Sequence, residues 1–302
     1  MRATADIVIV AGCAKGRPEK GFYDSLAFVE HLCECQPGSR LLLLLGEDAS
    51  EVARELSSTH GIDVVAISGV GLATYTSEAY RRVLSAELAE IGPAYICIPQ
   101  TSQGMEWAPA VAAEIGADCL SCIDAVERVD GQVCFQKDLY GGKVKGRFAP
   151  SGATTVITVP SGAFKRKPQP STAPGQVQTK HIDCRLQATD PLGVVPSEGE
   201  FADISEANIV IAVGNGIGSE ENLVWIQRLA GLFPRAAVAG SRIVCDRGWL
   251  DYQQQVGVTG ATVAPALYIA CGISGATQHR VGMRGSEFVV AINTDPSAPM
   301  FN

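Results

Sequence analysis

Short apolar runs alternate with amphipathic stretches through the first two-thirds of the chain, and this order constrains the fold more than any other feature of the sequence. It is typical of βαβ units, whose successive strands join one mostly parallel sheet. The amphipathic stretches carry apolar residues at helical spacing and predict crossover helices. The predicted strands are Ile7–Val10, Arg40–Leu45, Val64–Ile67, Tyr95–Pro99 and Thr155–Val159, and the predicted helices are Asp48–His60 and Ser77–Ile91.

Prolines and glycines break this regularity before residue 200, and 302 residues is a large number for one hydrophobic core. Periodicity then returns with an apolar strand at 208–213 and a helix from about Glu220 to Gly231. We therefore predict two α/β domains, a Rossmann-like domain over residues 1–200 and a domain with a parallel sheet over residues 201–302. The interrupting residues are Pro168, Pro170, Pro174, Pro191, Gly193, Pro196 and Gly199.

Charge and hydropathy exclude two classes of partner. A net charge of -8 argues against a nucleic-acid-binding surface. The apolar run Leu41–Leu45 is far too short to cross a bilayer, and the chain begins with the strand-like ADIVIVAG and not with an export signal. We therefore predict a cytoplasmic protein with no membrane insertion.

The ten cysteines lie scattered through a large acidic chain, which favours reduced thiols over a disulfide framework. Cys119 and Cys122 have the spacing of a redox or zinc pair, but no second pair of this spacing or nearby histidine completes a metal site. We interpret this pair, and Cys33 with Cys35, as structural residues, and we predict no metal.

Glycine-rich turns follow apolar strands in the segment from Gln255 to Phe301. An open α/β sheet binds ligands at the carboxyl ends of its strands, where backbone amides and polar side chains meet the ligand. The segment therefore predicts a cofactor pocket. The polar residues at its strand ends are Thr259, Ser274, Gln278, His279 and Asn293.

Three motifs in this segment, QVG-x-TG, LYIA-x-GISGA-x-QH and VAIN-x-DP-x-AP, occur in the same order in the alpha subunit of electron-transfer flavoproteins, the FixB family. Looser matches in the same order are LATYTSEAYRRVL, PQTSQGMEWAPAVAAEIGADCLS, YGGK and TVPSGAF. The chain therefore resembles this family over most of its length. The resemblance implies that the second domain binds FAD and that the first packs against a beta subunit.

The resemblance also implies which residues hold FAD. Gly257 and Gly260 would let the backbone approach the flat ring closely, and Thr259 would present a hydroxyl to it. Val258 stands where the family commonly has glutamine, so we expect an altered redox potential and a retained site. The implied set is Gly216, Ser241, Arg242, Gln255, Val256, Gly257, Val258, Thr259, Gly260, Ser274, Gly275, Ala276, Thr277, Gln278, His279 and Asn293.

Polar members of this set have more specific expected partners. Ser241, Ser274 and Gln278 suit phosphate or ribityl oxygens, and Asn293 suits the adenosine half. The alternative interpretation of each is the capping of a turn.

Arg242 and His279 are the candidates for electrostatic tuning of the flavin. In the matching motifs, an arginine lies near the ring and a histidine approaches the pyrimidine edge, where each favours flavin states that carry negative charge. Without the resemblance, a surface pair between Arg242 and Asp246 and a structural histidine would be the preferred interpretations.

The glycine-rich residues 214–219 follow a strand and are expected to open a helix, whose first amides could meet a phosphate. The alternative is a tight turn before a capped helix. The family generally has arginine in place of Asn215, and its members usually continue with an ADYG-containing tail where this chain ends at Asn302. We therefore expect FAD to dissociate faster than from longer relatives.

The predicted function is the FAD-binding alpha subunit of a heterodimeric electron carrier. Its expected partners are the beta subunit, a donor dehydrogenase and an electron acceptor, for which a quinone oxidoreductase is one candidate. A nucleotide-binding regulatory or assembly subunit without redox activity is the alternative, and a dehydrogenase with its own substrate is a third possibility. Hydrolysis is disfavoured, because Ser274 lies in GISGA and not in G-x-S-x-G.

Overall fold

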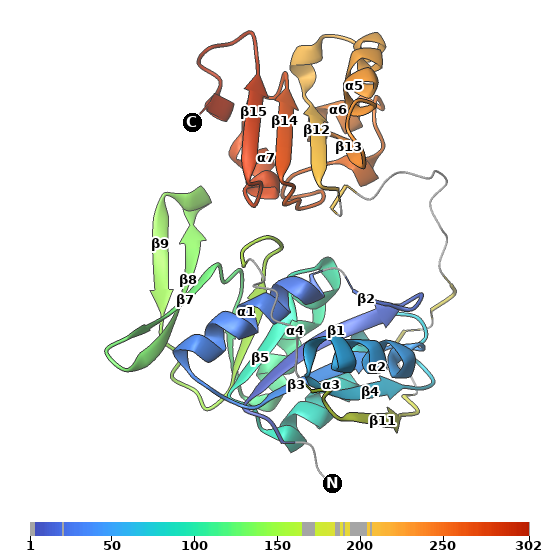
Figure 1. Cartoon of the computed structure of the whole chain (residues 1–302), viewed down its shortest axis with the longest axis vertical. Coiled ribbons are helices and arrows are strands. Elements are labelled where there is room, and N and C mark those ends of the chain that lie inside the picture. Colours follow the sequence, from blue (N-terminus) through green and yellow to red (C-terminus); the bar gives the residue numbers. More distant parts are fainter. Residues whose placement is uncertain are drawn as a thin grey trace. The chain divides into compact units, whose positions relative to one another are not determined.

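The chain divides into two compact units, Met1–Val195 and Pro196–Asn302, in a computed structural model (Figure 1). The predicted domain boundary at residue 200 lies outside the described residues. Pro168, Pro170, Pro196 and Gly199, which suggested it, also lie outside them. The structure describes residues 4–19, 21–164, 173–184, 188–189, 191–193, 204–205 and 207–301.

The first unit contains an eight-stranded sheet with the order β11-β4-β3-β1-β5-β10-β6, and the short β2 pairs with β1 beside it. All pairs along this order are parallel. From β1 the chain builds outward through β3 and β4, then returns to add β5 and β10 on the other side, which is the doubly wound topology. The strands are β1 (Ile7–Ala14), β2 (Arg17–Pro18), β3 (Arg40–Leu45), β4 (Asp63–Ser68), β5 (Tyr95–Pro99), β6 (Asp118–Leu120), β10 (Thr155–Val159) and β11 (Val177–His181).

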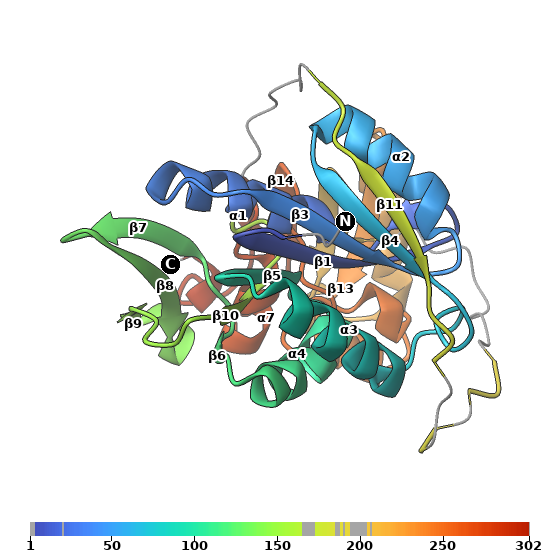
Figure 2. The ribbon, with the colours of Figure 1, turned by 90° about the horizontal axis from the view of Figure 1, so that it is seen from below.

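Helices cover both faces of this sheet, α1 (Phe22–Cys35) and α2 (Ala49–His60) on one side and α3 (Ser77–Ile91) and α4 (Ser102–Ile115) on the other (Figure 2). Alternate residues of each strand therefore enter different cores. Ile7 and Ile9 pack in the cluster that contains α1 and α2, whereas Val8 and Val10 pack in the cluster that contains α3 and α4. Burial on both faces explains why the central strands are continuous apolar runs.

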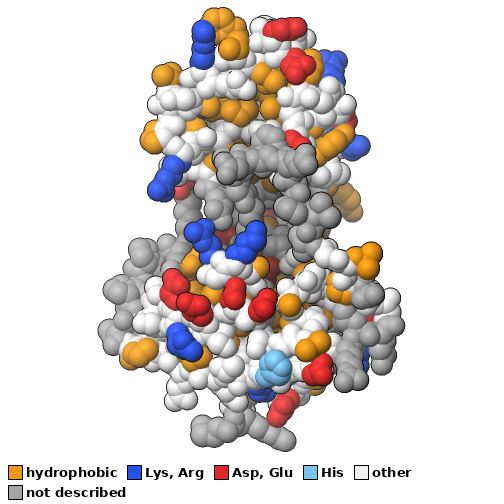
Figure 3. All heavy atoms as spheres, turned by 90° about the vertical axis from the view of Figure 1, so that its right-hand side faces the viewer, with side chains coloured by type: hydrophobic (Ala, Val, Ile, Leu, Met, Phe, Trp, Pro, Cys, Tyr) orange, Lys and Arg blue, Asp and Glu red, His pale blue; other side chains and the backbone are white. Residues whose placement is uncertain are grey.

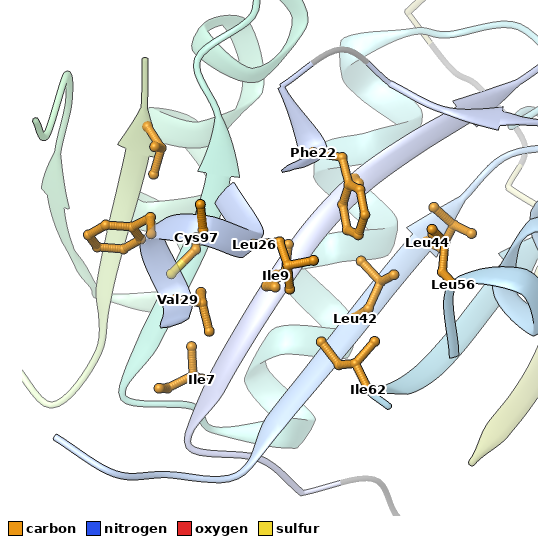
Figure 4. Close-up of a cluster of buried hydrophobic side chains, with 14 of the residues drawn as sticks. Ile7, Ile9, Phe22, Leu26, Val29, Leu42, Leu44, Leu56, Ile62 and Cys97 are labelled. Atoms are coloured by element: carbon orange, nitrogen blue, oxygen red, sulfur yellow. The ribbon is translucent and has the colours of Figure 1, made fainter. Parts of the chain in front are cut away.

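The core beneath α1 is filled by large aliphatic and aromatic side chains (Figure 4). Phe22, Leu26 and Val29 of the helix meet Ile9 and Leu42 of the sheet, and all five are at most 2% exposed. Burial of such side chains contributes about 1.5–3 kcal/mol each.

Two of the crossover helices have polar N-caps and glycine C-caps. The Thr76 hydroxyl accepts a hydrogen bond from Ala79 N–H at the start of α3, and Thr101 accepts one from Gly104 N–H at the start of α4. Each helix ends at a glycine in the left-handed region, Gly92 and Gly116. These caps satisfy terminal backbone groups and fix the helix ends beside the sheet.

A small antiparallel sheet of β7 (Ala125–Val129), β8 (Gln132–Leu139) and β9 (Val144–Phe148) follows β6. Phe135 of β8 is fully buried, and its ring lies 6.3 Å from Phe28 of α1. A short 3-10 helix, η1 (Tyr140–Gly142), joins β8 and β9. This sheet is absent from the elements predicted above.

The second unit has a four-stranded parallel sheet with the order β13-β12-β14-β15. Its strands are β12 (Ile209–Val213), β13 (Ala236–Gly240), β14 (Leu267–Cys271) and β15 (Phe288–Ile292). From β12 the chain first adds β13 on one side and then crosses back to add β14 and β15 on the other side. This sheet therefore also has a switch point, between β12 and β14. The helices are α5 (Leu223–Ala230), α6 (Arg242–Asp246) and α7 (Thr277–Met283), with 3-10 turns η2 (Asn215–Ile217), η3 (Glu220–Asn222), η4 (Tyr252–Gln254) and η5 (Pro299–Phe301).

Separate hydrophobic clusters form on the two faces of this sheet. Leu223 and Ile226 of α5 belong to one cluster, and Met283 of α7 belongs to the other. Hydrophobic side chains are also visible on the surface of this unit (Figure 3). The side chains of Trp225 and Leu232 are 61% and 76% exposed.

The predicted elements compare closely with the structure. Three predicted strands and the helix Ser77–Ile91 are confirmed with their bounds, while β1 continues to Ala14 and α2 begins at Ala49 with Asp48 as its N-cap. The helical segment predicted from about Glu220 is confirmed, since it begins there as η3 after residues 214–219 and continues as α5 to Ala230. Gly218 has φ +88° and ends the 3-10 turn η2, and the first turn of the following helix, η3, is also of the 3-10 type before α5 begins at Leu223.

None of the described helices combines the length and the apolar composition that crossing a bilayer requires.

The ten cysteines, all within the described residues, are free thiols in the structure. Cys119 is exposed on β6, and Gln100 donates a side-chain hydrogen bond to the Cys122 sulfur. Among the residues that the structure describes, no three His, Cys, Asp or Glu side chains could hold a metal ion together.

Candidate functional site

The loops that follow the four strands of the second unit meet at the carboxyl edge of its sheet. Gly214–Gly216 follow β12, Ser241–Ile243 follow β13 and Gly272–Ser274 follow β14, while Asn293 and Asp295 follow β15. All four loops line one cavity of about 580 Å³, a size typical of cofactor sites. The cavity therefore lies at the switch point between β12 and β14, where open α/β sheets bind ligands.

The loops after β12 and β14 approach each other so closely that only glycine fits. Gly216 N–H donates a 2.9 Å hydrogen bond to Gly272 O. A Cβ atom on Gly214 would lie 2.3 Å from Gly272 O, and one on Gly272 would lie 2.6 Å from the Gly216 carbonyl carbon. Gly272 also has φ +64°. These glycines bring two backbone loops together at the base of the site.

A further loop, residues 255–261, completes the wall beside the four strand-end loops. It is tied to β13 by Val256 N–H to Gly240 O (3.0 Å) and to α7 by Val258 N–H to Gln278 O (2.9 Å). Within it, Gln255 Nε2 donates to Thr259 Oγ1 at 2.8 Å. Gln255 is 3% exposed, so this bond fixes the orientation of the Thr259 hydroxyl at the cavity.

The structure brings most of the predicted site residues together. The buried ones in the cavity wall are Gln255, Val256, Gly257 and His279. The partly or fully exposed ones are Gly216, Ser241, Arg242, Val258, Thr259, Ser274, Ala276, Gln278 and Asn293.

Gly260, Gly275 and Thr277 do not line the cavity. Gly260 closes the 255–261 loop, because its N–H donates to Gly257 O and a Cβ there would lie 2.3 Å from Gln255 O. Gly275 has φ +85°, and a Cβ on it would lie 2.2 Å from Met300 N. Thr277 is the first residue of α7. Gly260 and Gly275 therefore allow the close backbone approaches that shape the cavity wall, and they do not face the cavity themselves.

Asn293 holds the site loops together through its side-chain amide. Its Nδ2 donates to Ile273 O at 3.0 Å, and its Oδ1 accepts from Asp295 N–H at 3.0 Å. The amide thereby connects the loop after β15 with the loop after β14.

Several lining residues were absent from the predicted set: Gly214, Asn215, Ile243, Gly272, Ile273 and Asp295. The signal that could have found them was the strand ends themselves. Gly214 directly follows β12, in the segment already expected to meet a phosphate, and Gly272 directly follows β14, so the rule that ligands bind at carboxyl ends applies to both.

Among the described residues that line the cavity, Arg242 is the cation and Asp295 is the anion. The Arg242 side chain is 68% exposed, and its Nε lies 3.5 Å from Asp246 Oδ2. The two residues lie four positions apart, at the ends of α6. An exposed pair of this kind stabilises the fold little and leaves the guanidinium able to turn toward a ligand.

His279 projects from α7 into the cavity wall and is 7% exposed. Its Nε2 lies 2.8 Å from the Tyr268 hydroxyl, whereas its buried Nδ1 has no hydrogen-bond partner. Burial lowers the pKa of His279 to about 4, and the backbone of Val256 opposes this effect incompletely. The imidazole is therefore neutral at pH 7 and contributes no positive charge to the site.

Comparison with known proteins matches both units to the same family. Residues 34–183 match the electron transfer flavoprotein domain, and residues 203–284 match the electron transfer flavoprotein FAD-binding domain. The second match contains three of the four strands of the second sheet and most of the cavity wall.

Similar proteins carry related names. The chain is 32% identical to the electron transfer flavoprotein subunit alpha of Bacillus subtilis (strain 168), over 87% of this chain and 81% of that protein. It is 35% identical to protein FixB of Clostridium saccharobutylicum, over 85% and 78%. It is 32% identical to the acryloyl-CoA reductase electron transfer subunit beta of Anaerotignum propionicum, over 88% and 81%.

These matches cover both units and include the residues of the switch-point cavity. The family contains FAD-binding carriers of electrons, and the cavity has the position and the size that a cofactor requires. The chain belongs to the alpha-subunit family of electron-transfer flavoproteins, and its cofactor is FAD.

Proposed function

We propose that the switch-point cavity of the second unit holds FAD and that the chain carries electrons through it. The observation that supports this most strongly is the convergence of all four strand-end loops on one cavity within the matched FAD-binding domain. FAD supplies the redox chemistry when bound. The protein supplies position, polarity and exclusion of water.

The chemical groups of the wall fit such a cofactor. Gly214, Gly216 and Gly272 offer bare backbone at the base, so a flat or phosphate-bearing group meets no side chain there. Ser241, Ser274 and Gln278 offer hydroxyl and amide groups for phosphate or ribityl oxygens. We assign the Thr259 hydroxyl, oriented by Gln255, to the ring.

A wall variant tests this location. Ala276 is exposed and lines the cavity, so Ala276→Trp should fill space without disturbing the core. FAD titration, followed by flavin fluorescence with the beta subunit present, should show binding weakened at least about tenfold, or about 1.4 kcal/mol. Val224→Trp, on the exposed side of α5, is the matched control and should bind like the parent. Equal affinity for all three proteins would place FAD elsewhere.

Arg242 should make the first electron easier to add, because its attraction grows as negative charge develops on the ring. Arg242→Ala should lower the potential of the first electron by about 20–60 mV, the effect of about 0.5–1.4 kcal/mol for an exposed charge. Potentiometric titration of the FAD-loaded protein measures it. Arg228→Ala, which removes an exposed cation stacked on Trp225 outside the cavity, should leave the potential unchanged. A parent-like potential in Arg242→Ala would remove Arg242 from this role.

Alpha subunits of this family pair with a beta subunit, and we propose that the first unit carries the docking surface. Donor and acceptor are proposed by analogy, a dehydrogenase on one side and an acceptor such as a quinone oxidoreductase on the other. One relative from Acetobacterium woodii, 32% identical, is named as a subunit of a lactate dehydrogenase that uses NAD(+) and ferredoxin.

Co-expression with the beta subunit followed by size exclusion tests the pairing of the two subunits, and separate monomers would contradict it. We also propose a cytoplasmic location, on the basis of ten free cysteines.

A further inference from the structure

Tyr268 and His279 form a buried polar pair behind the cavity wall. Tyr268, on β14, is fully buried, and its hydroxyl is 2.8 Å from His279 Nε2 on α7. The two rings lie 6.2 Å apart at 63°. Around Tyr268 the core is apolar, with Val256, Val263 and Met283 in the same cluster. Neither the motifs nor the family match assigns a role to this tyrosine.

Both rings are uncharged at neutral pH. Burial raises the pKa of Tyr268 well above its usual range, and burial lowers the pKa of His279 to about 4. One hydrogen therefore lies between the hydroxyl oxygen and Nε2, and there are two ways to supply it. Either the tyrosine donates to Nε2 and the imidazole carries its hydrogen on Nδ1, or Nε2–H donates to the tyrosine.

The second arrangement leaves two buried groups without partners. The tyrosine hydrogen would have no acceptor, because the hydroxyl has no other hydrogen bond among the described residues, and the Nδ1 lone pair would have no donor. The first arrangement leaves only the Nδ1 hydrogen unpaired, and the backbone of Val256 favours a hydrogen on the ring. Buried donors and acceptors are costly to leave unmade, so the first arrangement is preferred.

We propose that Tyr268 is the positioning residue of His279: its hydroxyl donates to Nε2 and fixes the imidazole as the Nδ1–H tautomer in the cavity wall. The histidine then acts on a bound ligand as an oriented neutral dipole. For FAD this rests on the proposed function, but the tautomer itself is a property of the protein without ligand.

The ¹⁵N spectrum of the FAD-free protein tests the tautomer directly, since the protonated and bare nitrogens of a neutral imidazole have well-separated shifts. A His279→Gln variant identifies the signals among the four histidines. In the parent at pH 7, the Nδ1–H tautomer should exceed the Nε2–H tautomer by about tenfold or more, with Nε2 shifted by an accepted hydrogen bond. A dominant Nε2–H tautomer in the parent would overturn the proposal without any variant.

Tyr268→Phe removes only the hydroxyl, so the excess of the Nδ1–H tautomer should fall toward equal populations. Tyr252→Phe is the matched control, because its exposed hydroxyl donates to Asp246 in the same unit. It should preserve the parent spectrum. An unchanged tautomer ratio in a folded Tyr268→Phe would show that Val256 and packing fix the ring, and would refute the role of Tyr268.

The FAD-loaded complex with the beta subunit gives a separate readout. Tyr268→Phe should shift the potential of the first electron with FAD fully bound, whereas Arg228→Ala, which acts outside the cavity, should not. A shift supports the action of the oriented ring on the flavin, and identical potentials would refute that part. The predicted tautomer in a protein that binds no FAD would support the assignment of Tyr268 and refute the proposed function.

Discussion

Gly272→Ala is expected to lower the free energy of unfolding of the second unit by about 3–5 kcal/mol and to abolish FAD binding. Part of the loss, about 1–2 kcal/mol, is the strain of a side chain at φ +64°. The remainder comes from overlap, since the new Cβ would lie 2.6–2.7 Å from the Gly216 carbonyl carbon and Ile217 N. Both are backbone atoms, so no side chain can turn aside. The loops after β12 and β14 must separate, which opens the base of the site.

Gly248→Ala provides the matched control for this substitution. Gly248 has φ +75° in the same unit, but a Cβ on it would meet nothing within 4 Å. It should therefore lose only the strain, about 1–2 kcal/mol, and keep FAD binding. Urea unfolding followed by fluorescence of Trp225 and Trp249, together with FAD titration, measures both effects. Equal destabilisation by the two variants would contradict the close approach of the two loops.

The second large effect is a fall in the free energy of unfolding of the first unit as the pH rises toward the pKa of Glu19. The Glu19 carboxylate accepts a 2.7 Å hydrogen bond from Gly12 N–H at the carboxyl end of β1, and Thr101 donates weakly at 3.5 Å. Burial raises the pKa of Glu19 to about 7, and these hydrogen bonds oppose it only in part. Cys13 and Tyr80 face the same carboxylate and stay protonated, since burial raises the pKa of each.

The sign follows from the direction of the shift. The folded chain holds the Glu19 proton up to about pH 7, whereas the unfolded chain releases it near pH 4.5, the ordinary pKa of a glutamate side chain. Stability is therefore lost as the pH rises from about 4.5 to 7, by up to about 3 kcal/mol. The glutamine of Glu19→Gln cannot ionise. The cost of burying its amide lowers the free energy of unfolding of the variant by a similar amount at every pH.

The measurement is the difference in the free energy of unfolding between the parent and Glu19→Gln, taken at pH 5 and again at pH 8. Relative to the parent, the variant should gain about 2.5 kcal/mol between these two values, because part of the loss in the parent has already occurred at pH 5. Urea unfolding followed by Trp107 fluorescence, with Trp225 and Trp249 replaced by phenylalanine in both proteins, reports on the first unit. Trp107 is 2% exposed and packs in the core of that unit. The same pH dependence in both proteins would show that other groups, such as Asp24, cause it.

The sequence by itself determined the elements whose burial is uniform. The strands Arg40–Leu45, Tyr95–Pro99 and Thr155–Val159 are apolar because helices cover both faces, and that pattern is local. The polar wall of the cavity was predictable for a related reason. Carboxyl ends of parallel strands meet at one edge, so residues far apart in sequence come together without knowledge of any contact.

The tertiary structure alone decided the features that depend on partners. β11 (Val177–His181) is mostly exposed and polar, and only its pairing with β4 makes it a strand. Gly260 and Gly275 look like ligand-binding glycines in the motifs, yet close contacts with Gln255 and Met300 give them a role in shaping the wall. The hydrogen bond between Tyr268 and His279 joins a strand to a helix. Contacts of this kind arise when different helices, strands and loops pack together, so the periodicity of apolar residues along the sequence cannot predict them.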